Sequence, residues 1–226
     1  MKTTKQILQL VCAGALALAV AGCTKTHVDP PPAIAALNII NASPDAPGVT
    51  FYADQNRINY DVFAYTQQTQ YLNAIAGTRV ISAYEGQTNK LSDTVALKPG
   101  RFYSLFLSGQ WQTPEFVLLE DSLARPDAGQ ARVRFVNMSV GSPALDLGFA
   151  DSTVVSNRTY KQNSGFVSIK ANKSYQFVIR EHGSAQAKVT LPAQTLGEGR
   201  IYTVWARGIY SQPGDNGVGG GIILNY

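Results

Sequence analysis

The chain has 226 residues, with 19 Lys and Arg residues against 15 Asp and Glu residues, and only two cysteines. This length allows one large domain or two ordinary domains after an export signal. The basic residues are scattered, with Arg132 and Arg134 the closest pair, so the basic stripe of a nucleic-acid-binding protein is absent and no nucleic-acid partner is expected.

The N-terminus has the pattern of an export signal. A short basic start precedes an almost wholly apolar run over residues 8–21, which is too short to span a bilayer as a helix. The run closes with Val20-Ala21-Gly22-Cys23, which resembles the lipobox of bacterial lipoproteins. The resemblance implies that residues 1–22 are a lipoprotein signal peptide and that Cys23 carries the lipid. The alternative is an ordinary signal peptide with a chance cysteine.

Cleavage before Cys23 would leave a nearly neutral protein with a single thiol. Removing Lys2 and Lys5 leaves 17 basic against 15 acidic residues, and Cys12 is lost with the signal. Disulfides and cysteine chemistry are therefore excluded from the body. Residues 23–36 include a triple proline and are predicted to form a stiff tether. We expect the protein to be lipid-anchored in the cell envelope. The outer membrane is the expected location because Thr24 rather than Asp follows the cysteine. Whether the protein lies on the periplasmic or the exterior face of that membrane stays open.

The rest of the chain repeats itself. Residues 37–43 align with residues 133–139 at an offset of 96, and residues 100–103 align with residues 199–202 at an offset of 99. Two collinear matches at nearly one offset indicate a duplicated unit. The predicted domains are 37–121 and 131–226, joined by a linker at 122–130.

Each unit has the pattern of successive β-strands. Residues 132–135 alternate polar and apolar side chains, and further segments rich in β-branched and aromatic residues are bounded by turn residues. These further predicted strands are 101–107, 175–180, 188–191, 200–206 and 222–226, the last being aligned with 116–120. Convincing helices are absent. The predicted fold is all-β, with two tandem immunoglobulin-like antiparallel β-sandwich domains.

One turn of the first unit resembles a known family. The segment Asn41-Ala42-Ser43-Pro44-Asp45-Ala46-Pro47 and the stretch Gly199–Gly208 are similar to the DUF4397 family, a domain of unknown function. The resemblance implies tandem β-domains in exported, often lipid-anchored proteins of the Bacteroidetes kind, and it brings no catalytic residues. The second unit has drifted from the turn motif at residues 138–143. Prolines around Asp45 favour a turn-forming role for this residue over a ligand role.

Motifs for metals and cofactors are weak. His27 lies in the tether and His182 in a predicted hairpin, and neither has neighbouring ligands. No metal site and no cofactor is expected. The Gly-rich loop 213–221 contains Asp215-Asn216-Gly217 and is the one local sequence that could wrap Ca²⁺, although a turn-forming loop is the favoured interpretation.

Motifs for catalysis are weak as well. No Gly-x-Ser-x-Gly elbow is present, and a serine triad would have to use His182. A glycoside hydrolase needs two positioned carboxylates, and the five glutamates after the signal are dispersed. The sequence therefore predicts a protein that is not an enzyme. An envelope-attached glycoside hydrolase, or another hydrolase using a carboxylate pair brought together in space, remains the alternative.

A binding role has more support. Trp111 in a predicted loop and Tyr210 after Gly208 are the candidate ligand contacts, because exposed aromatic rings beside amides bind sugars or protein partners. The favoured interpretation of these rings is nevertheless that they cover the core or close an end of a sandwich. Asp-Ser/Thr-aliphatic triplets mark Thr94, Ser122 and Ser152 as candidate O-glycosylation sites. The resulting hypothesis is a lipid-anchored envelope protein with a binding or structural role and a protein or glycan partner.

Overall fold

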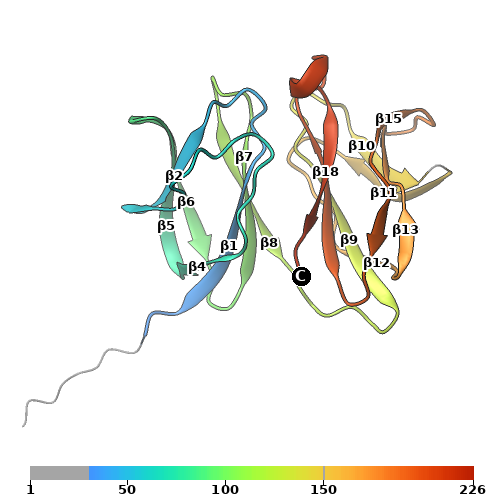
Figure 1. The fold of residues 1–226 in the computed structure, drawn as a ribbon, viewed down its shortest axis with the longest axis horizontal. Coiled ribbons are helices and arrows are strands. Elements are labelled where there is room, and N and C mark those ends of the chain that lie inside the picture. Colours follow the sequence, from blue (N-terminus) through green and yellow to red (C-terminus); the bar gives the residue numbers. More distant parts are fainter. Residues whose placement is uncertain (1–30, 150) are drawn as a thin grey trace, which may run out of the picture. The chain divides into compact units, whose positions relative to one another are not determined.

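The computed structural model describes residues 31–149 and 151–226. The predicted signal peptide, Cys23 and most of the predicted tether lie outside the described residues. Residues Ala33–Tyr226 form one compact unit, which consists of two β-sandwich halves (Figure 1). We call residues 33–121 the first half and residues 130–226 the second half. Among the described residues, no helix is long and apolar enough to cross a membrane.

The first half packs two four-stranded sheets. One sheet has the order β4-β1-β7-β8 and the other has the order β3-β2-β5-β6. The strands are β1 (Ile34–Asn41), β2 (Val49–Ala53), β3 (Asn56–Arg57), β4 (Leu72–Ile75), β5 (Gly77–Glu85), β6 (Thr88–Leu97), β7 (Phe102–Ser108) and β8 (Glu115–Asp121). The inward residues of alternating positions, such as Val49, Phe51 and Ile81, form its core.

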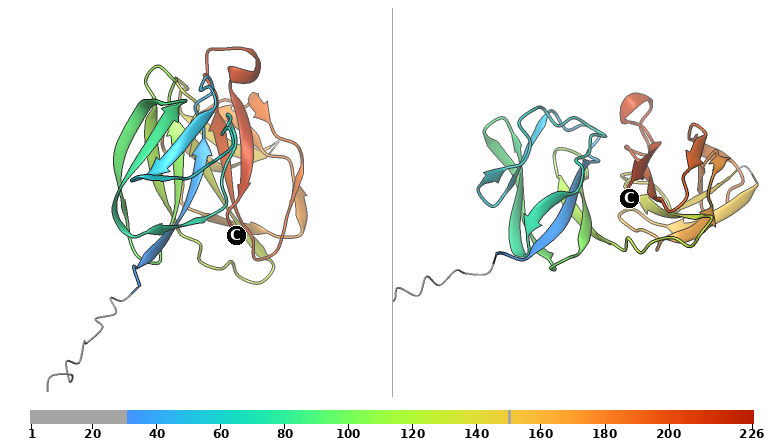
Figure 2. Two further views of the ribbon diagram at one scale, coloured as in Figure 1. Left: turned by 60° about the vertical axis from the view of Figure 1, so that its left-hand side comes forward. Right: turned by 60° about the horizontal axis from the view of Figure 1, so that its bottom comes forward.

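The second half repeats this arrangement. Its sheets have the orders β12-β9-β17-β18 and β11-β10-β14-β15, with a two-stranded addition β13-β16. The strands are β9 (Gln130–Asn137), β10 (Leu145–Phe149), β11 (Ser152–Arg158), β12 (Val167–Lys170), β13 (Lys173–Tyr175), β14 (Val178–Glu181), β15 (Ala187–Thr190), β16 (Gln194–Leu196), β17 (Ile201–Arg207) and β18 (Gly219–Leu224). A 3₁₀ turn, Gly214–Asn216, precedes β18. Figure 2 shows both halves from two further directions.

The duplication seen in the sequence is a duplication of topology. β1 pairs with β7 through Leu37 and Tyr103, and β9 pairs with β17 through Val133 and Tyr202, which preserves the offsets of 96 and 99. Both of these pairings are parallel, whereas the other strand pairings are antiparallel. The sandwich prediction is confirmed, with one parallel pair in each half. The chain visits the second sheet between the two strands, so no hairpin forces them to be antiparallel.

Two strand predictions need correction. The predicted strand 175–180 is broken, because β13 ends at Tyr175 and pairs with β16, while β14 begins at Val178 and pairs with β10. The last strand begins at Gly219 rather than at 222. Its register on β17 makes residues 220–224 the equivalents of 116–120, so the predicted alignment of 222–226 is two residues out. Its three leading glycines give no apolar signal, yet two of them are required by packing: a Cβ on Gly221 would lie 2.7 Å from Trp205 Nε1, and one on Gly220 would lie 2.9 Å from Leu191 Cδ2.

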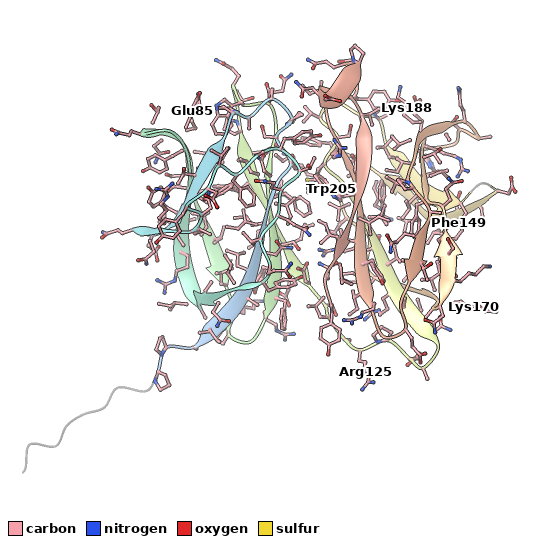
Figure 3. The ribbon with its side chains drawn as sticks, in the orientation of Figure 1. Glu85, Arg125, Phe149, Lys170, Lys188 and Trp205 are labelled. Carbon is pink, nitrogen blue, oxygen red and sulfur yellow. The ribbon has the colours of Figure 1, made fainter. Side chains whose placement is uncertain are left out.

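A third hydrophobic cluster joins the two halves. It is self-complementary, because each half contributes the same four positions of the repeat. The equivalent pairs are Ile40 and Val136, Ala42 and Met138, Phe106 and Trp205, and Leu119 and Ile223. Phe106 and Trp205 meet with their ring centroids 5.8 Å apart, and Figure 3 labels Trp205. Each half therefore contributes the same patch of its repeat to this cluster.

Candidate functional site

Trp111 belongs to the core of the first half. Its side chain is 8% exposed, and its indole Nε1 donates a hydrogen bond to Glu85 Oε2 at 2.9 Å. Its backbone N–H donates to Asp45 Oδ1 at 2.8 Å, so the proline-flanked turn fastens the loop between β7 and β8 over the end of the sandwich. The expectation of an exposed ring at Trp111 is wrong because the loop folds back onto the core. Asp45 has the structural role that its sequence context favours.

Tyr210 occupies the equivalent position of the second half. Its hydroxyl donates to Glu181 Oε1, just as Trp111 donates to Glu85, and the two glutamates are related by the repeat. A lysine lies over each ring, with Lys188 Nζ 4.4 Å from the centroid of Tyr210. Burial and the neighbouring Glu181 carboxylate raise the pKa of Tyr210 to about 12. The two candidate ligand contacts are thus one repeated cap, an aromatic ring held between a glutamate and a lysine. Figure 3 labels Glu85 and Lys188.

The remaining residues that the sequence singled out lie at separate places in the structure and do not form a common site. Thr94, Ser122 and Ser152 are all in exposed positions, as a modification site requires. His182 lies 3.0 Å from Asp146 Oδ1 through its Nδ1 atom, a partner that sequence reasoning missed. Within the described ranges, no group of three potential metal ligands is formed. The cysteine predicted to carry the lipid lies outside these ranges.

Two tyrosines stand side by side on the outer face of the first half. Tyr52 on β2 and Tyr84 on β5 alternate with the core residues Phe51 and Ala83, so their side chains leave the opposite face of the sheet. Their ring centroids are 5.1 Å apart and their planes are inclined at 62°. Both rings are half-buried, which leaves one part of each accessible. The arrangement is an edge-to-face pair.

Hydroxyl and amide groups surround the two rings. Asn89 on β6 donates from its amide nitrogen to Tyr84 Oη at 3.2 Å and to Ser92 Oγ at 2.8 Å. Ser92 Oγ is also 2.7 Å from Ser82 Oγ on β5. The amide therefore links the aromatic pair to a row of hydroxyls across two strands. We call Tyr52, Tyr84, Asn89, Ser82 and Ser92 the tyrosine face.

The tyrosine face carries no charged side chain at the outward register positions of β2, β5 and β6. By strand register, its further outward positions on β2, β5 and β6 are Thr50, Thr78, Val80, Thr94 and Ala96. On the edge strand β3, Arg57 is paired with Tyr52, and its guanidinium lies over the ring of Tyr60. Such a surface suits a neutral ligand that offers both apolar faces and hydroxyl groups.

The second half lacks this surface. At the repeat offset of 96, Gly148 stands for Tyr52 and Arg180 for Tyr84. Arg180 is buried and donates from Nη2 to the carbonyl oxygen of Phe149 at 2.5 Å. The duplication therefore supplies an internal comparison: the same sheet is aromatic and neutral in one half and glycine-bearing and charged in the other.

A groove of about 360 Å³ opens between the sheet edges of the first half. Its floor includes the core residues Leu37 and Ile81, and β3 and β4 form its walls. Ala53 lines the groove at the position where the second half has Phe149, whose ring stacks on Tyr175 at a centroid distance of 4.9 Å. The volume is at the low end of the range for small-molecule pockets.

The one carboxylate in the lining of this groove is already engaged. Asp54 Oδ2 accepts a hydrogen bond from Arg79 Nη1 at 3.1 Å, and its Oδ1 accepts one from the backbone N–H of Val80 at 3.0 Å. The Val80 N–H and the Arg79 guanidinium hold the pKa of Asp54 below its usual value. The groove therefore lacks the protonated acid and opposed carboxylate that glycoside hydrolysis needs.

Sequence reasoning missed the tyrosine face because it depends on strand pairing. Val49 and Phe51 point to one face of the strand, and Thr50 and Tyr52 point to the other. The sequence indicates these two faces but not which of them packs against the second sheet. The comparison of the two repeats holds the available signal, since Tyr52 and Tyr84 both lose their aromatic character at the offset of 96. At a core position, both copies of a duplicated fold normally have the same type of residue.

The family is settled by comparison of the sequence. The sequence model of the family described as "Domain of unknown function (DUF4397)" matches residues 35–148, which is half of the chain. The chain belongs to the DUF4397 family. The expectation drawn from the turn at 41–47 is confirmed. The DUF4397 match covers the strands of the first half from the second residue of β1 onward and extends into β10 of the second half. No curated protein matches the chain.

Two solved structures give weak similarities to this DUF4397 chain. One is CBMbc, a family CBM26 module of Eubacterium rectale Amy13K in complex with maltoheptaose, at 7% identity over 84% of this chain and 95% of that chain, with a TM-score of 0.25. The other is a structure titled "Alpha-glucan binding by a streptococcal virulence factor". Its sequence identity is 14%, the match covers 75% of this chain and 91% of that chain, and the TM-score is 0.23. At these TM-scores the superpositions establish neither a shared fold nor a shared ligand.

Proposed function

We propose that this protein is a lipid-anchored, non-enzymatic binding protein of the cell envelope whose first half binds a neutral glycan on the tyrosine face. The single observation that carries the proposal is the accessible pair Tyr52 and Tyr84, joined to Asn89 on an uncharged sheet face. The lipid at Cys23 and the outer-membrane location are the parts of the proposal that rest on the sequence pattern.

The chemistry of a neutral sugar matches the groups of this face. A pyranose ring presents C–H groups on its flat sides and hydroxyls around its rim. The C–H sides pack on the electron-rich faces of the tyrosine rings. The rim hydroxyls can donate to the carbonyl oxygen of the Asn89 amide, whose N–H groups are engaged with Tyr84 and Ser92, and they can exchange hydrogen bonds with the Ser92 hydroxyl, which both donates and accepts.

The groove of the first half also favours a binding role over the hydrolase alternative. Its lining contains Asp54, whose pKa is lowered by the Val80 N–H and by the Arg79 guanidinium, so this carboxylate is unsuited to act as a general acid. The groove can accommodate an apolar group, but it supplies no carboxylate pair.

The test is a glycan array followed by calorimetric titration of the best hit. Because Ala33–Tyr226 form one compact unit, the chain from Thr24 onward retains the whole folded part. We expect binding of neutral oligosaccharides, with at least a tenfold loss of affinity in Tyr52→Ala and in Tyr84→Ala. Tyr226→Ala is the matched control, because Tyr226 is 58% exposed in the second half and lies off the tyrosine face. No hit on the array, or equal loss in the control, would refute the glycan proposal.

A further inference from the structure

The junction between the halves contains two equivalent corners that differ in one respect. In one corner Tyr160 of the second half meets Ser108 of the first, with their hydroxyl oxygens 3.0 Å apart. In the other corner Tyr65 of the first half meets Arg207 of the second, whose Nη1 donates to Tyr65 Oη at 3.2 Å. Tyr65 and Tyr160 are equivalent because the residues after them, Thr66 and Lys161, donate the same backbone hydrogen bond, to Asn41 and to Asn137. Ser108 and Arg207 are equivalent at the offset of 99.

The first corner is filled by a carboxylate and its partners. Glu115 Oε1 accepts a hydrogen bond from the Tyr160 hydroxyl at 3.1 Å, and its Oε2 lies 2.8 Å from Lys161 Nζ. Glu115 is paired with Ser108 across β7 and β8. The corner therefore has a tyrosine, a carboxylate and a cation in mutual contact, and its charges are balanced.

The second corner has lost the carboxylate. By strand register Gly219 takes the place of Glu115, since it is paired with Arg207 across β17 and β18. Thr66 takes the place of Lys161 in the sequence repeat, and both residues have a positive φ of about 70°. A pocket of about 300 Å³ results, lined by Tyr65, Thr66, Arg207, Asp215 and the segment 217–219.

Arg207 is the cation of this pocket. Its guanidinium lies 5.2 Å from the centre of the Tyr65 ring, which orients the planar group. Among the residues that the structure describes, no carboxylate lies within ion-pair distance of Arg207, and Asp215 is exposed on the rim. A Cβ on Gly219 would be 3.2 Å from Arg207 Cζ, so the glycine keeps the face of the guanidinium open. A cation in the loop 213–221 would be repelled by this group.

We infer that this pocket binds a carboxylate-bearing ligand, with the ligand carboxylate on Arg207 in the place that Glu115 fills in the equivalent corner. Arg and a carboxylate fit each other through two parallel hydrogen bonds. The Tyr65 hydroxyl is a further donor, because burial raises the pKa of Tyr65 and keeps the phenol protonated. A uronic acid of a glycan and the C-terminal carboxylate of a peptide share this chemistry.

The test is calorimetric titration of the full chain with paired probes. Glucuronate and N-acetyl-alanine are the two carboxylates, and glucose and N-acetyl-alaninamide are their uncharged counterparts. We expect one carboxylate to bind and its counterpart to give no heat; which carboxylate binds more tightly identifies the source. Arg207→Met should weaken this binding at least tenfold, and Asp215→Asn should strengthen it by removing a repelling charge.

Gly219→Glu is the sharper variant, because it rebuilds the filled corner with the chain's own carboxylate. We expect it to abolish carboxylate binding while the melting temperature stays at or above that of the parent. Tyr52→Ala should leave carboxylate binding unchanged, which separates this pocket from the tyrosine face. The inference is overturned by absent binding of both carboxylates at millimolar concentration, or by undiminished binding in both Arg207→Met and Gly219→Glu.

Discussion

Arg134 and Asp121 form an ion pair of 2.6 Å across the junction of the two halves, and their side chains are 1% and 0% exposed. Asp121 Oδ2 also accepts hydrogen bonds from the Tyr71 hydroxyl at 2.5 Å and from Ser104 Oγ at 2.7 Å. Arg134 Nε donates to Thr203 Oγ1 at 2.8 Å. The buried charges are therefore paired and hydrogen-bonded, which is the condition under which a protein interior tolerates them.

The repeat explains why there is one such pair rather than two. Thr203 and Ser104 are equivalent, and Asn225 occupies the position of Asp121, where it accepts a hydrogen bond from Thr203 at 2.6 Å. On the other side, Asn38 occupies the position of Arg134 and is uncharged. A single cation thus meets a single anion at the junction, and the equivalent positions carry the uncharged amides Asn38 and Asn225.

Replacement of Asp121 by alanine should be strongly destabilising. The change leaves the Arg134 guanidinium buried without its anion, and loss of one partner of a buried pair costs about 3–5 kcal/mol in the free energy of unfolding. Urea denaturation measures this cost. The neighbouring Glu120→Ala is the control, because Glu120 pairs with Lys98 at 3.9 Å in an exposed position and should cost less than about 1 kcal/mol. Equal effects of the two changes would contradict the assigned role of the pair.

Trp111→Ala and Tyr210→Ala should differ although the two residues are equivalent. Trp111 is buried in the first core, and truncation of such a residue costs about 3–5 kcal/mol. Tyr210 is half-buried, so its truncation should cost clearly less. Thermal and urea unfolding of both variants measure the difference. A small effect at Trp111 would mean that its ring is not part of the core in solution.

Stability should fall in strong alkali between about pH 10 and pH 12. Burial, together with the Glu115 carboxylate, raises the pKa of Tyr160 to about 12, while the unfolded chain titrates near 10. The unfolded state therefore releases its proton first, so stabilisation present below pH 10 is lost as the pH rises to about 12. Urea unfolding at several pH values measures the slope. Tyr160→Phe should have a shallower slope, and an unchanged slope would exclude Tyr160 as a source.

Cys23→Ala should abolish lipid attachment. If the lipobox at 20–23 is processed, this cysteine is the one residue that can carry the thioether, and its loss should release the body from the membrane fraction. Metabolic labelling with a fatty-acid probe and membrane fractionation give the two readouts. Cys12→Ala is the control and should retain the label. Label that persists in Cys23→Ala would disprove the anchor.

The fold was largely predictable because it depends on local pattern and repetition. The alternation at 132–135 predicts β9. The two sequence offsets identify β1 and β7 as the equivalents of β9 and β17. The break at Gln176 was not predictable, because aromatic residues flank it on both sides and only the change of pairing partner interrupts the strand. The glycines at the start of β18 were missed because their role is to make room for Trp205 and Leu191.

The candidate sites were less predictable, because exposure is set by long-range packing. Trp111 follows a loop signal in the sequence, but the turn at Asp45, which is 66 positions earlier, ties that loop over the core. Tyr52 has the same local context as a strand residue of either face. Its accessibility follows from the pairing of β2 with β5, a non-local contact that composition and periodicity do not encode.

The parallel pairing of β1 with β7 bears on how the protein responds to force. β1 is the first described strand, and it is held by six consecutive register positions to β7, from Ala36 to Asn41. A pull on the chain ahead of Ala33, directed along β1, loads these positions together in shear instead of opening them one after another. Strand β1 would then act as a mechanical clamp at the entrance to the first half.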